Sequence, residues 1–229
     1  MNTKISKYYD QKQAEDYEIR RNNPIWHAES EVFNKIKDRI AGKYNNLMEV
    51  LDVGAGTGRW IPHLHEVSAK YIGTDISKNM LDQAELKLES CPEEFKKSAQ
   101  LIISSLEQLP INVSGKFDLI IMTRFLSRFS INEIKNIMNI IRNYSKGDLI
   151  VSVRVADKNI DIFSEILELI IKSPIGAIKR YRKSGRLTYA RLDSDYNKVI
   201  TESGFRIVKK NLVAKDKHNR YEYWELTLS

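Results

Sequence analysis

Short apolar runs alternate with amphipathic segments along most of the chain, and the two patterns predict strands and helices in turn. Residues 78–88 and 131–144 carry apolar side chains at the spacing of a helix that buries one face. Five other short segments predict strands, and the apolar run at residues 117–123 suits the centre of a sheet. They are residues 48–53, 70–75, 100–104, 117–123 and 148–155. The alternation predicts an α/β fold with a mostly parallel sheet and helices on both faces.

The last third of the chain first interrupts this alternation and then resumes it. Residues 161–172 have helical spacing, and a further helix is predicted at residues 194–202 with Gly204 as its stop. Two apolar strands, residues 205–213 and 221–228, follow with only a short turn between them. A short turn between strands predicts an antiparallel hairpin at the edge of the sheet.

The segment before the first strand has a different character. Residues 5–21 are polar and aromatic with helical spacing, and residues 29–40 place apolar side chains along one helical face. Residues 22–24, Asn-Asn-Pro, predict a turn between them. We therefore expect a helical flap at residues 1–44 ahead of the main domain at residues 45–229.

Composition excludes several classes of protein. Of the 229 residues, 42% are hydrophobic and 29% are charged, as in ordinary globular domains, and no apolar run approaches the ~20 residues of a membrane span. The N-terminus has no signal-peptide pattern, so a cytoplasmic protein is expected. Cys91 is the single cysteine, which excludes an internal disulfide and a multi-cysteine metal site, and we expect no metal.

The net charge of +7 is confined to one segment. Seven basic residues and no acidic ones lie between Lys172 and Arg191, and the remaining 30 basic residues equal the 30 acidic ones. This segment belongs to a predicted insertion at residues 156–192. Local positive charge of this kind attracts anions, although a solvated charge run is the common alternative.

A glycine-rich turn follows the first predicted strand. Glycines alternate at positions 54, 56 and 58 before the chain enters a predicted helix, so a ligand can approach bare backbone there. Alone, this turn leaves open a nucleotide-like cofactor site or a purely structural turn. Asp52 precedes it and either orders the turn or faces a cationic group. Asp75 ends the second strand, 17 residues after Gly58, where a carboxylate can accept two hydrogen bonds from a ribose diol; the alternative is an acid at the start of a helix.

Four motifs near the strand ends resemble those of class I S-adenosylmethionine-dependent methyltransferases, the group that includes enzymes of ubiquinone and menaquinone biosynthesis. Residues 50–58 (VLDVGAGTG) resemble the first motif and residues 71–81 (YIGTDISKNML) the second. Residues 105–110 (SLEQLP) resemble the third and residues 117–121 (FDLII) the fourth. The resemblance implies a Rossmann-like, seven-stranded sheet and S-adenosylmethionine as the cofactor. A dehydrogenase is disfavoured because its fingerprint spaces the glycines as G-x-G-x-x-G.

The resemblance also implies which residues surround the cofactor. In the second motif the acid holds the ribose and the next apolar residue packs on adenine, while aromatic groups of the flap shield the sulfonium. The third motif usually opens with aspartate, so Ser105 is a departure that puts the adenine amino contact in doubt. The implied cofactor-binding residues are Tyr17, Trp26, Asp52, Gly54, Ala55, Gly56, Gly58, Asp75, Ile76, Met80, Ser105, Leu106, Glu107 and Thr123.

Methyl transfer chiefly requires alignment of a nucleophile, helped in some cases by a base. The candidates for a catalytic role are His27 in the flap, Arg124 after the fourth strand and Arg154 at the end of the fifth. For His27 the alternative is a surface or packing role, and for Arg124 it is solvation or pairing with the flap. The candidates for acceptor binding are Arg124, Arg128, Arg154, Arg180, Arg182 and Tyr189.

The basic insertion predicts a small, anionic acceptor such as a phosphorylated or carboxylated metabolite or sugar, and we favour O-methylation. The alternative is an RNA methyltransferase, since Tyr181 and Tyr189 lie among the basic residues and aromatic rings stack on bases. No Asn/Asp-Pro-Pro-Tyr/Phe motif for amine methylation ends the fourth strand. A third possibility is a cofactor-binding module without catalysis.

Overall fold

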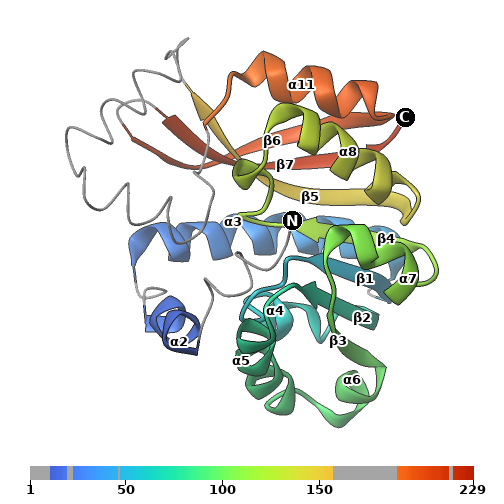
Figure 1. Ribbon diagram of the computed structural model, residues 1–229. Coiled ribbons are helices and arrows are strands. Elements are labelled where there is room, and N and C mark those ends of the chain that lie inside the picture. Colours follow the sequence, from blue (N-terminus) through green and yellow to red (C-terminus); the bar gives the residue numbers. More distant parts are fainter. Residues whose placement is uncertain (1–10, 20–22, 46, 157–189, 217–218) are drawn as a thin grey trace.

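A computed structural model describes residues 11–19, 23–45, 47–156, 190–216 and 219–229. Seven strands form one sheet in the order β3-β2-β1-β4-β5-β7-β6 (Figure 1). Neighbouring strands are parallel except that β7 runs antiparallel to both β5 and β6. The strands are β1 (Met48–Val53), β2 (Ser68–Asp75), β3 (Ala99–Ile103), β4 (Phe117–Met122), β5 (Ser145–Ala156), β6 (Phe205–Lys215) and β7 (Asn219–Leu228). The predicted Rossmann-like, seven-stranded sheet with a C-terminal hairpin is confirmed.

Helices cover both faces of the sheet, as the alternating pattern predicts. Successive strand residues point to opposite faces, so Leu51 packs with α7, α8 and α11 on one side while Val50 packs with α3, α4, α5 and α6 on the other. The helices are α2 (Gln11–Ile19), α3 (Pro24–Ala41), α4 (Ile61–Leu64), α5 (Lys78–Glu89), α6 (Glu93–Ser98), α7 (Leu109–Asn112), α8 (Ile131–Arg142) and α11 (Asp193–Glu202), with short 3-10 turns η1 (Gly42–Tyr44), η2 (Leu106–Gln108) and η3 (Leu126–Arg128).

The start of α3 corrects one expectation. Residues 22–24 predicted a turn ahead of a helix at 29–40, whereas α3 already begins at Pro24. The Asn23 side chain accepts a hydrogen bond from the Trp26 backbone N–H at 3.1 Å, and Pro24 occupies the first turn, where it needs no intrahelical partner for its nitrogen. The extra turn carries Trp26 and leads directly into Glu29, and both residues become important below.

The other end of α3 and the following turn are tied to the sheet by ion pairs. Arg39 pairs with the buried Glu225 of β7, and Lys43 pairs with Asp148 of β5 at 2.9 Å. Tyr44 donates its hydroxyl to the same carboxylate at 3.2 Å. These contacts fix the helix along one face of the C-terminal half of the sheet.

The remaining differences concern short elements. The helix expected after the glycine turn is a single turn, α4, and the sequence pattern did not indicate α6 or α7 because four to six residues are too few to show a helical period. The predicted helix at residues 161–172 lies outside the described residues, as does nearly all of the predicted insertion. No helix in the described part of the chain is long and apolar enough to cross a membrane.

Substitution of Gly58 tests whether the glycine turn after β1 is too closely packed to accept a side chain. Its φ is +68°, and an added Cβ would fall 2.9 Å from the Ala84 backbone of α5. We expect Gly58→Ala to lower the free energy of unfolding by about 3 kcal/mol, since left-handed strain and overpacking add. Gly115→Ala is the matched control, because its φ is +95° but its Cβ would meet open space. Urea unfolding of both variants measures the difference, and equal losses would contradict the packing argument.

Candidate active site

The candidate site lies where the strand order reverses, between β1 and β4. In open α/β sheets ligands bind outside the carboxyl ends of the strands at such a point. The glycine turn leaves the end of β1, Asp75 ends the neighbouring β2, and Arg124 follows β4. The fold therefore brings together residues that are widely separated in the sequence.

Backbone hydrogen bonds hold the glycine turn against β2. The N–H groups of Gly54 and Ala55 both donate to the Thr74 carbonyl, at 2.8 and 2.9 Å. Gly54, Gly56 and Gly58 all have positive φ, between +59° and +74°. A Cβ on Gly54 would fall 2.6 Å from the Phe125 ring, so the turn packs closely on its surroundings and requires glycine.

Asp75 joins the end of β2 to this turn. Its carboxylate accepts hydrogen bonds from the Gly56 N–H at 3.0 Å and from the Ser77 N–H at 2.9 Å, one on each oxygen. Burial raises the pKa of the Asp75 carboxyl above its usual value, although both hydrogen bonds and the Arg128 charge lower it. Each carboxylate oxygen keeps a second lone pair, so Asp75 can still accept hydrogen bonds from a ligand.

Asp52 lies beneath the turn rather than at its surface. It is 1% exposed and accepts a hydrogen bond from the Tyr71 hydroxyl at 3.1 Å. Burial, with a contribution from the Asp75 charge, raises the pKa of Asp52 to about 7, while the Tyr71 bond opposes the rise. Of the two roles considered for Asp52, ordering the floor of the turn is the one that these contacts support.

The other residues implied to bind the cofactor surround the turn, and several already have structural partners. Ser105 caps η2, accepting from the Gln108 N–H at 3.3 Å, where the family usually has aspartate. Thr123 accepts from the Trp60 indole at 2.8 Å. Met80 is buried with its methyl group 3.3 Å from the Cβ position of Gly56. Ile76 and Leu106 are half-buried, and Glu107 is exposed. Their contact with a cofactor stays a prediction.

A buried carboxylate from the flap lies beside the turn. Glu29 of α3 is 2% exposed and pairs with both Arg59, which follows Gly58, and Arg124. Arg124 donates to Glu29 through Nε at 3.1 and 3.2 Å and through Nη2 at 2.9 Å. Both guanidinium groups also lie over the Trp26 ring, at 4.5 Å for Arg59 and 3.8 Å for Arg124. We call Trp26, Glu29, Arg59 and Arg124 the Glu29 cluster.

Arg124 is held tightly within this cluster. Its φ is +53°, unusual for a residue with a side chain, and its backbone N–H donates to the Ser152 hydroxyl of β5. Burial lowers the pKa of the Arg124 guanidinium, but the Glu29 charge and hydrogen bond together with Tyr17 and Tyr223 outweigh it, and the net change is upward. The sequence left open whether Arg124 binds an acceptor or pairs with the flap, and the structure shows the flap pairing. No sequence pattern links Glu29 to Arg124, because 95 residues separate them.

The flap aromatics and His27 differ in their surroundings. Tyr17 of α2 packs edge-on against Trp26, with ring centroids 5.3 Å apart. The Trp26 ring already contacts two guanidinium groups. The predicted shielding of a sulfonium by Trp26 stays a prediction. His27 is exposed whereas Trp26 and Glu29 are buried, so its side chain does not join the Glu29 cluster. That exposure is compatible with the surface alternative, and the catalytic role of His27 stays a prediction.

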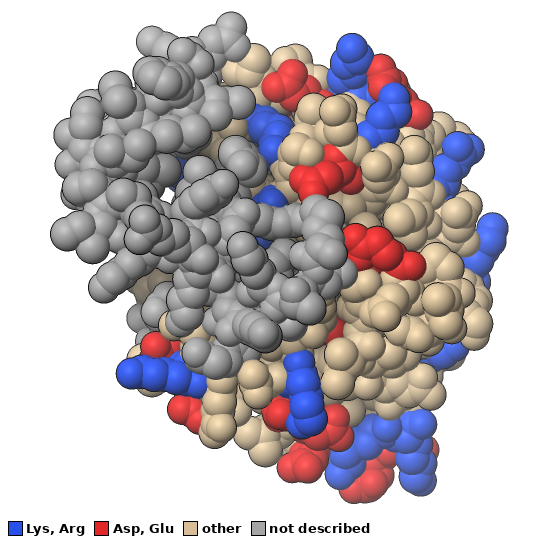
Figure 2. Space-filling view, viewed as in Figure 1, with Lys and Arg blue, Asp and Glu red and all other residues tan. Residues whose placement is uncertain are grey.

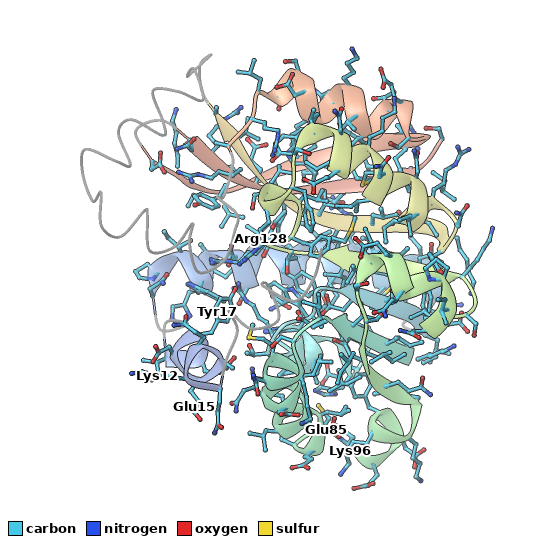
Figure 3. All side chains as sticks on the ribbon, viewed as in Figure 1. Lys12, Glu15, Tyr17, Glu85, Lys96 and Arg128 are labelled. Carbon is cyan, nitrogen blue, oxygen red and sulfur yellow. The ribbon has the colours of Figure 1, made fainter. Side chains whose placement is uncertain are left out.

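Further arginines line the same edge of the sheet. Arg128 donates through Nε to the Arg124 carbonyl at 3.2 Å, and Figure 3 labels it near the middle of the view, with Tyr17 on α2. Arg154 lies 3.9 Å from Asp216 and 5.6 Å from the centre of the Tyr221 ring. The remaining predicted acceptor-binding residues, at positions 180, 182 and 189, lie outside the described residues.

Two observations limit the chemistry of the described surface. Within the described ranges, no group of three or more His, Cys, Asp and Glu side chains is placed to hold a metal ion. Positive and negative side chains are interspersed over the described part of the face in Figure 2. The charged residues on this face therefore agree with the predicted balance of basic and acidic residues outside the basic segment.

The sheet order, the switch-point turn and the acid at the end of β2 define a class I methyltransferase fold. Residues 50–147 match the family model described as a methyltransferase domain. This segment of the chain is therefore similar to methyltransferase domains, in agreement with the resemblance of its motifs.

Two curated relatives share part of the sequence. An uncharacterized protein of Haemophilus influenzae is 34% identical over 142 residues, covering 59% of this chain and 51% of the relative. The demethylmenaquinone methyltransferase of Lactococcus lactis is 30% identical over 129 residues, covering 55% and 49%. The chain thus matches about half the length of these relatives.

Solved structures share the fold over a larger part of the chain. Magnesium protoporphyrin IX methyltransferase from Synechocystis with bound S-adenosylhomocysteine superposes with a TM-score of 0.74 at 18% identity, covering 100% of both chains. An S-adenosylmethionine-dependent methyltransferase from Clostridium acetobutylicum gives a TM-score of 0.59 at 18% identity, covering 84% of this chain and 90% of that one. At such identities the likeness is one of fold.

The Glu29 ion pairs make a strong prediction about stability. Glu29→Gln leaves two guanidinium groups without their buried counter-charge, and we expect a loss of about 3 kcal/mol in the free energy of unfolding. Asp82→Asn breaks the exposed Lys78–Asp82 pair and should cost less than about 0.5 kcal/mol. Urea unfolding compares the two variants. Similar small losses would mean that the Glu29 pairs contribute little.

The raised pKa of Asp52 predicts that the free energy of unfolding depends on pH. Its pKa is about 7 in the folded protein against an ordinary value of 3.8, so between these pH values the folded state keeps a proton that the unfolded chain releases. The Asp52 contribution to stability therefore falls as pH rises through this window and is lowest above pH 7. Asp52→Asn should become more stable relative to wild type by about 2–3 kcal/mol between pH 5 and pH 8. Urea unfolding at both pH values checks this, and a pH-independent difference would contradict it.

Proposed function

We propose that the protein transfers a methyl group from S-adenosylmethionine to a small anionic acceptor, with oxygen as the favoured methylated atom. The observation that carries the proposal is the pairing of Asp75 with the glycine turn at the switch point. That turn is a cradle in which added side chains would clash, and Asp75 retains acceptor capacity beside it. Both features suit a ligand with a ribose diol and a polar amino-acid part.

The cofactor would be held by the described residues around this cradle. Asp75 would accept hydrogen bonds from the ribose hydroxyls, and the half-buried Ile76 and Leu106 would provide apolar contact for the adenine. The N–H groups of Gly54 and Ala55 are already bonded to Thr74, so they shape the turn rather than bind ligand. S-adenosylmethionine, when bound, supplies a methyl group on a positively charged sulfur.

The arginines along the sheet edge support an anionic acceptor. Arg124 and Arg128 follow β4, Arg154 lies near the C-terminal end of β5, and these two strands lie side by side. Arginine suits planar carboxylates and phosphates because its guanidinium can donate two parallel hydrogen bonds. Acidic acceptors carry oxygen nucleophiles, which is why we favour O-methylation. Two of the similar proteins are named for small-molecule acceptors, demethylmenaquinone and magnesium protoporphyrin IX, which supports the small size.

The ribose assignment can be tested with Asp75→Asn. The variant keeps the shape of the side chain but loses its charge, and we expect the Kd for S-adenosylhomocysteine to rise at least ~10-fold because hydrogen bonds to a charged group contribute about 1.5–3 kcal/mol. Asp82→Asn on α5 is the control and should leave the Kd unchanged, since its partner is the exposed Lys78. Isothermal titration calorimetry gives both values.

A second measurement separates ribose contact from disorder of the turn. Adenosine and 2′,3′-dideoxyadenosine are compared as competitors of S-adenosylhomocysteine. Wild type should prefer adenosine, and Asp75→Asn should lose most of that preference because the hydroxyl groups no longer have a charged acceptor. A preference that survives in the variant would show that Asp75 does not bind the ribose.

A further inference from the structure

Tyr223 carries a buried hydroxyl group that has no hydrogen-bond partner among the described residues. It lies in β7 and is 1% exposed, and its hydroxyl oxygen is inaccessible to solvent. Burying a hydroxyl without a partner costs about 1–3 kcal/mol. Phenylalanine would fill the same space without this cost, so the hydroxyl group requires an explanation.

The hydroxyl borders the Glu29 cluster. Tyr223 pairs with Ser152 across β5 and β7, and directly opposite residues of antiparallel strands project from the same face. Ser152 is the residue whose hydroxyl accepts the Arg124 backbone N–H. The Tyr223 ring also packs edge-on against Trp60, with centroids 6.3 Å apart.

The charges of the cluster act on this hydroxyl. Burial raises the pKa of Tyr223 well above its ordinary value, with a further contribution from the Glu29 charge, while Arg59 and Arg124 oppose the rise. The phenol therefore stays protonated at neutral pH and can donate one hydrogen bond.

The cluster has more donors and positive charges than its own residues can match. Two guanidinium groups share the single carboxylate of Glu29, which leaves one positive charge in excess. Arg124 uses Nε and Nη2 for Glu29, and its Nη1 donates to none of the described residues. The Arg124 side chain is 31% exposed, so it is partly accessible from outside. What the cluster lacks is one negatively charged group with two acceptor oxygens.

We propose that Arg124 and Tyr223 form a binding site for a carboxylate carried by one of the two reactants. Arg124 donates to it through Nη1 and Tyr223 through its hydroxyl, while Glu29 and the Trp26 ring keep the Arg124 guanidinium in place. The carboxylate belongs either to the acidic acceptor or to the amino-acid part of the cofactor. This inference rests on the proposed methyltransferase function, because both reactants follow from it.

The test uses the full-length protein with Tyr223→Phe and, as the control, Tyr144→Phe. Tyr144 is also buried but precedes β5, at the opposite edge of the sheet from the Glu29 cluster. Calorimetry measures the affinity for S-adenosylhomocysteine and for 5′-methylthioadenosine, which lacks the amino-acid part. Acetate is then titrated onto protein saturated with S-adenosylhomocysteine, with chloride at equal ionic strength as the blank. Fluorescence follows acetate, since Trp26 stacks on Arg124.

The outcomes distinguish the two sources. If the carboxylate is that of the cofactor, Tyr223→Phe weakens S-adenosylhomocysteine binding about 10-fold and leaves methylthioadenosine unchanged. If it is that of the acceptor, cofactor binding is unchanged and acetate binding falls by a similar factor. Arg124→Lys, which keeps the charge but loses the planar fork, should give the same pattern, and Tyr144→Phe should match wild type.

The proposal is overturned if Tyr223→Phe and Arg124→Lys bind all three ligands as wild type does. Failure of the proposed function has a different signature, because wild type would then bind neither S-adenosylhomocysteine nor methylthioadenosine. In that case acetate titrated onto the unliganded protein still tests the site, and binding that depends on Tyr223 would support it.

Discussion

The arrangement of the active-site edge depends on one buried carboxylate, that of Glu29. A carboxylate that is 2% exposed is tolerated in a protein only when it is paired, and Glu29 has two arginine partners from two different loops. Arg59 follows the glycine turn and Arg124 follows β4, so neither loop can move without uncovering a charge. The flap helix, the turn and the switch point therefore form one unit.

A second carboxylate fixes the same turn from the opposite side. Asp75 accepts the Gly56 N–H from the end of β2, while Glu29 holds Arg59 immediately beyond Gly58. The turn is thus restrained in its middle and just beyond its end by acids that come from different layers of the fold. Lys87 of α5 adds a third restraint, because it donates to the Thr57 carbonyl and pairs with Glu18 of α2 at 2.8 Å. This rigidity agrees with a site that binds a ligand in a preformed cradle.

The sequence predicted the parts of this structure that depend on local pattern. The bounds of β1 agree with the apolar run at residues 48–53, and Gly204 follows the end of α11, with a φ of +79°, as expected. The order of the motifs predicted the class of fold. Each of these signals is carried by neighbouring residues, so one sequence is enough to detect it.

The Glu29 cluster and Tyr223 could not be found in the same way. Glu29 occupies an amphipathic helix in which an acid is ordinarily solvated, and its partner Arg124 lies 95 residues away in the sequence. Tyr223 is one of several aromatic residues in an apolar strand, and nothing nearby distinguishes its hydroxyl from an ordinary core tyrosine. Pairings across the sheet create both features. They are properties of the fold rather than of any segment.

The positive charge at this edge of the sheet is also created by the fold, which brings together arginines from different segments. Arg124 and Arg128 lie next to β4, and Arg154 lies at the end of β5, so parallel strands that run in the same direction deliver all three to one edge. Glu29 neutralises part of that charge from within the protein, and Asp216 lies 3.9 Å from Arg154. Two acids of the protein itself, one buried and one exposed, therefore offset part of the charge at this edge, and an anionic ligand has to share arginines that already have protein partners. Such a ligand gains less from bare Coulomb attraction than from hydrogen-bond geometry, because the desolvation of the arginines has already occurred on folding.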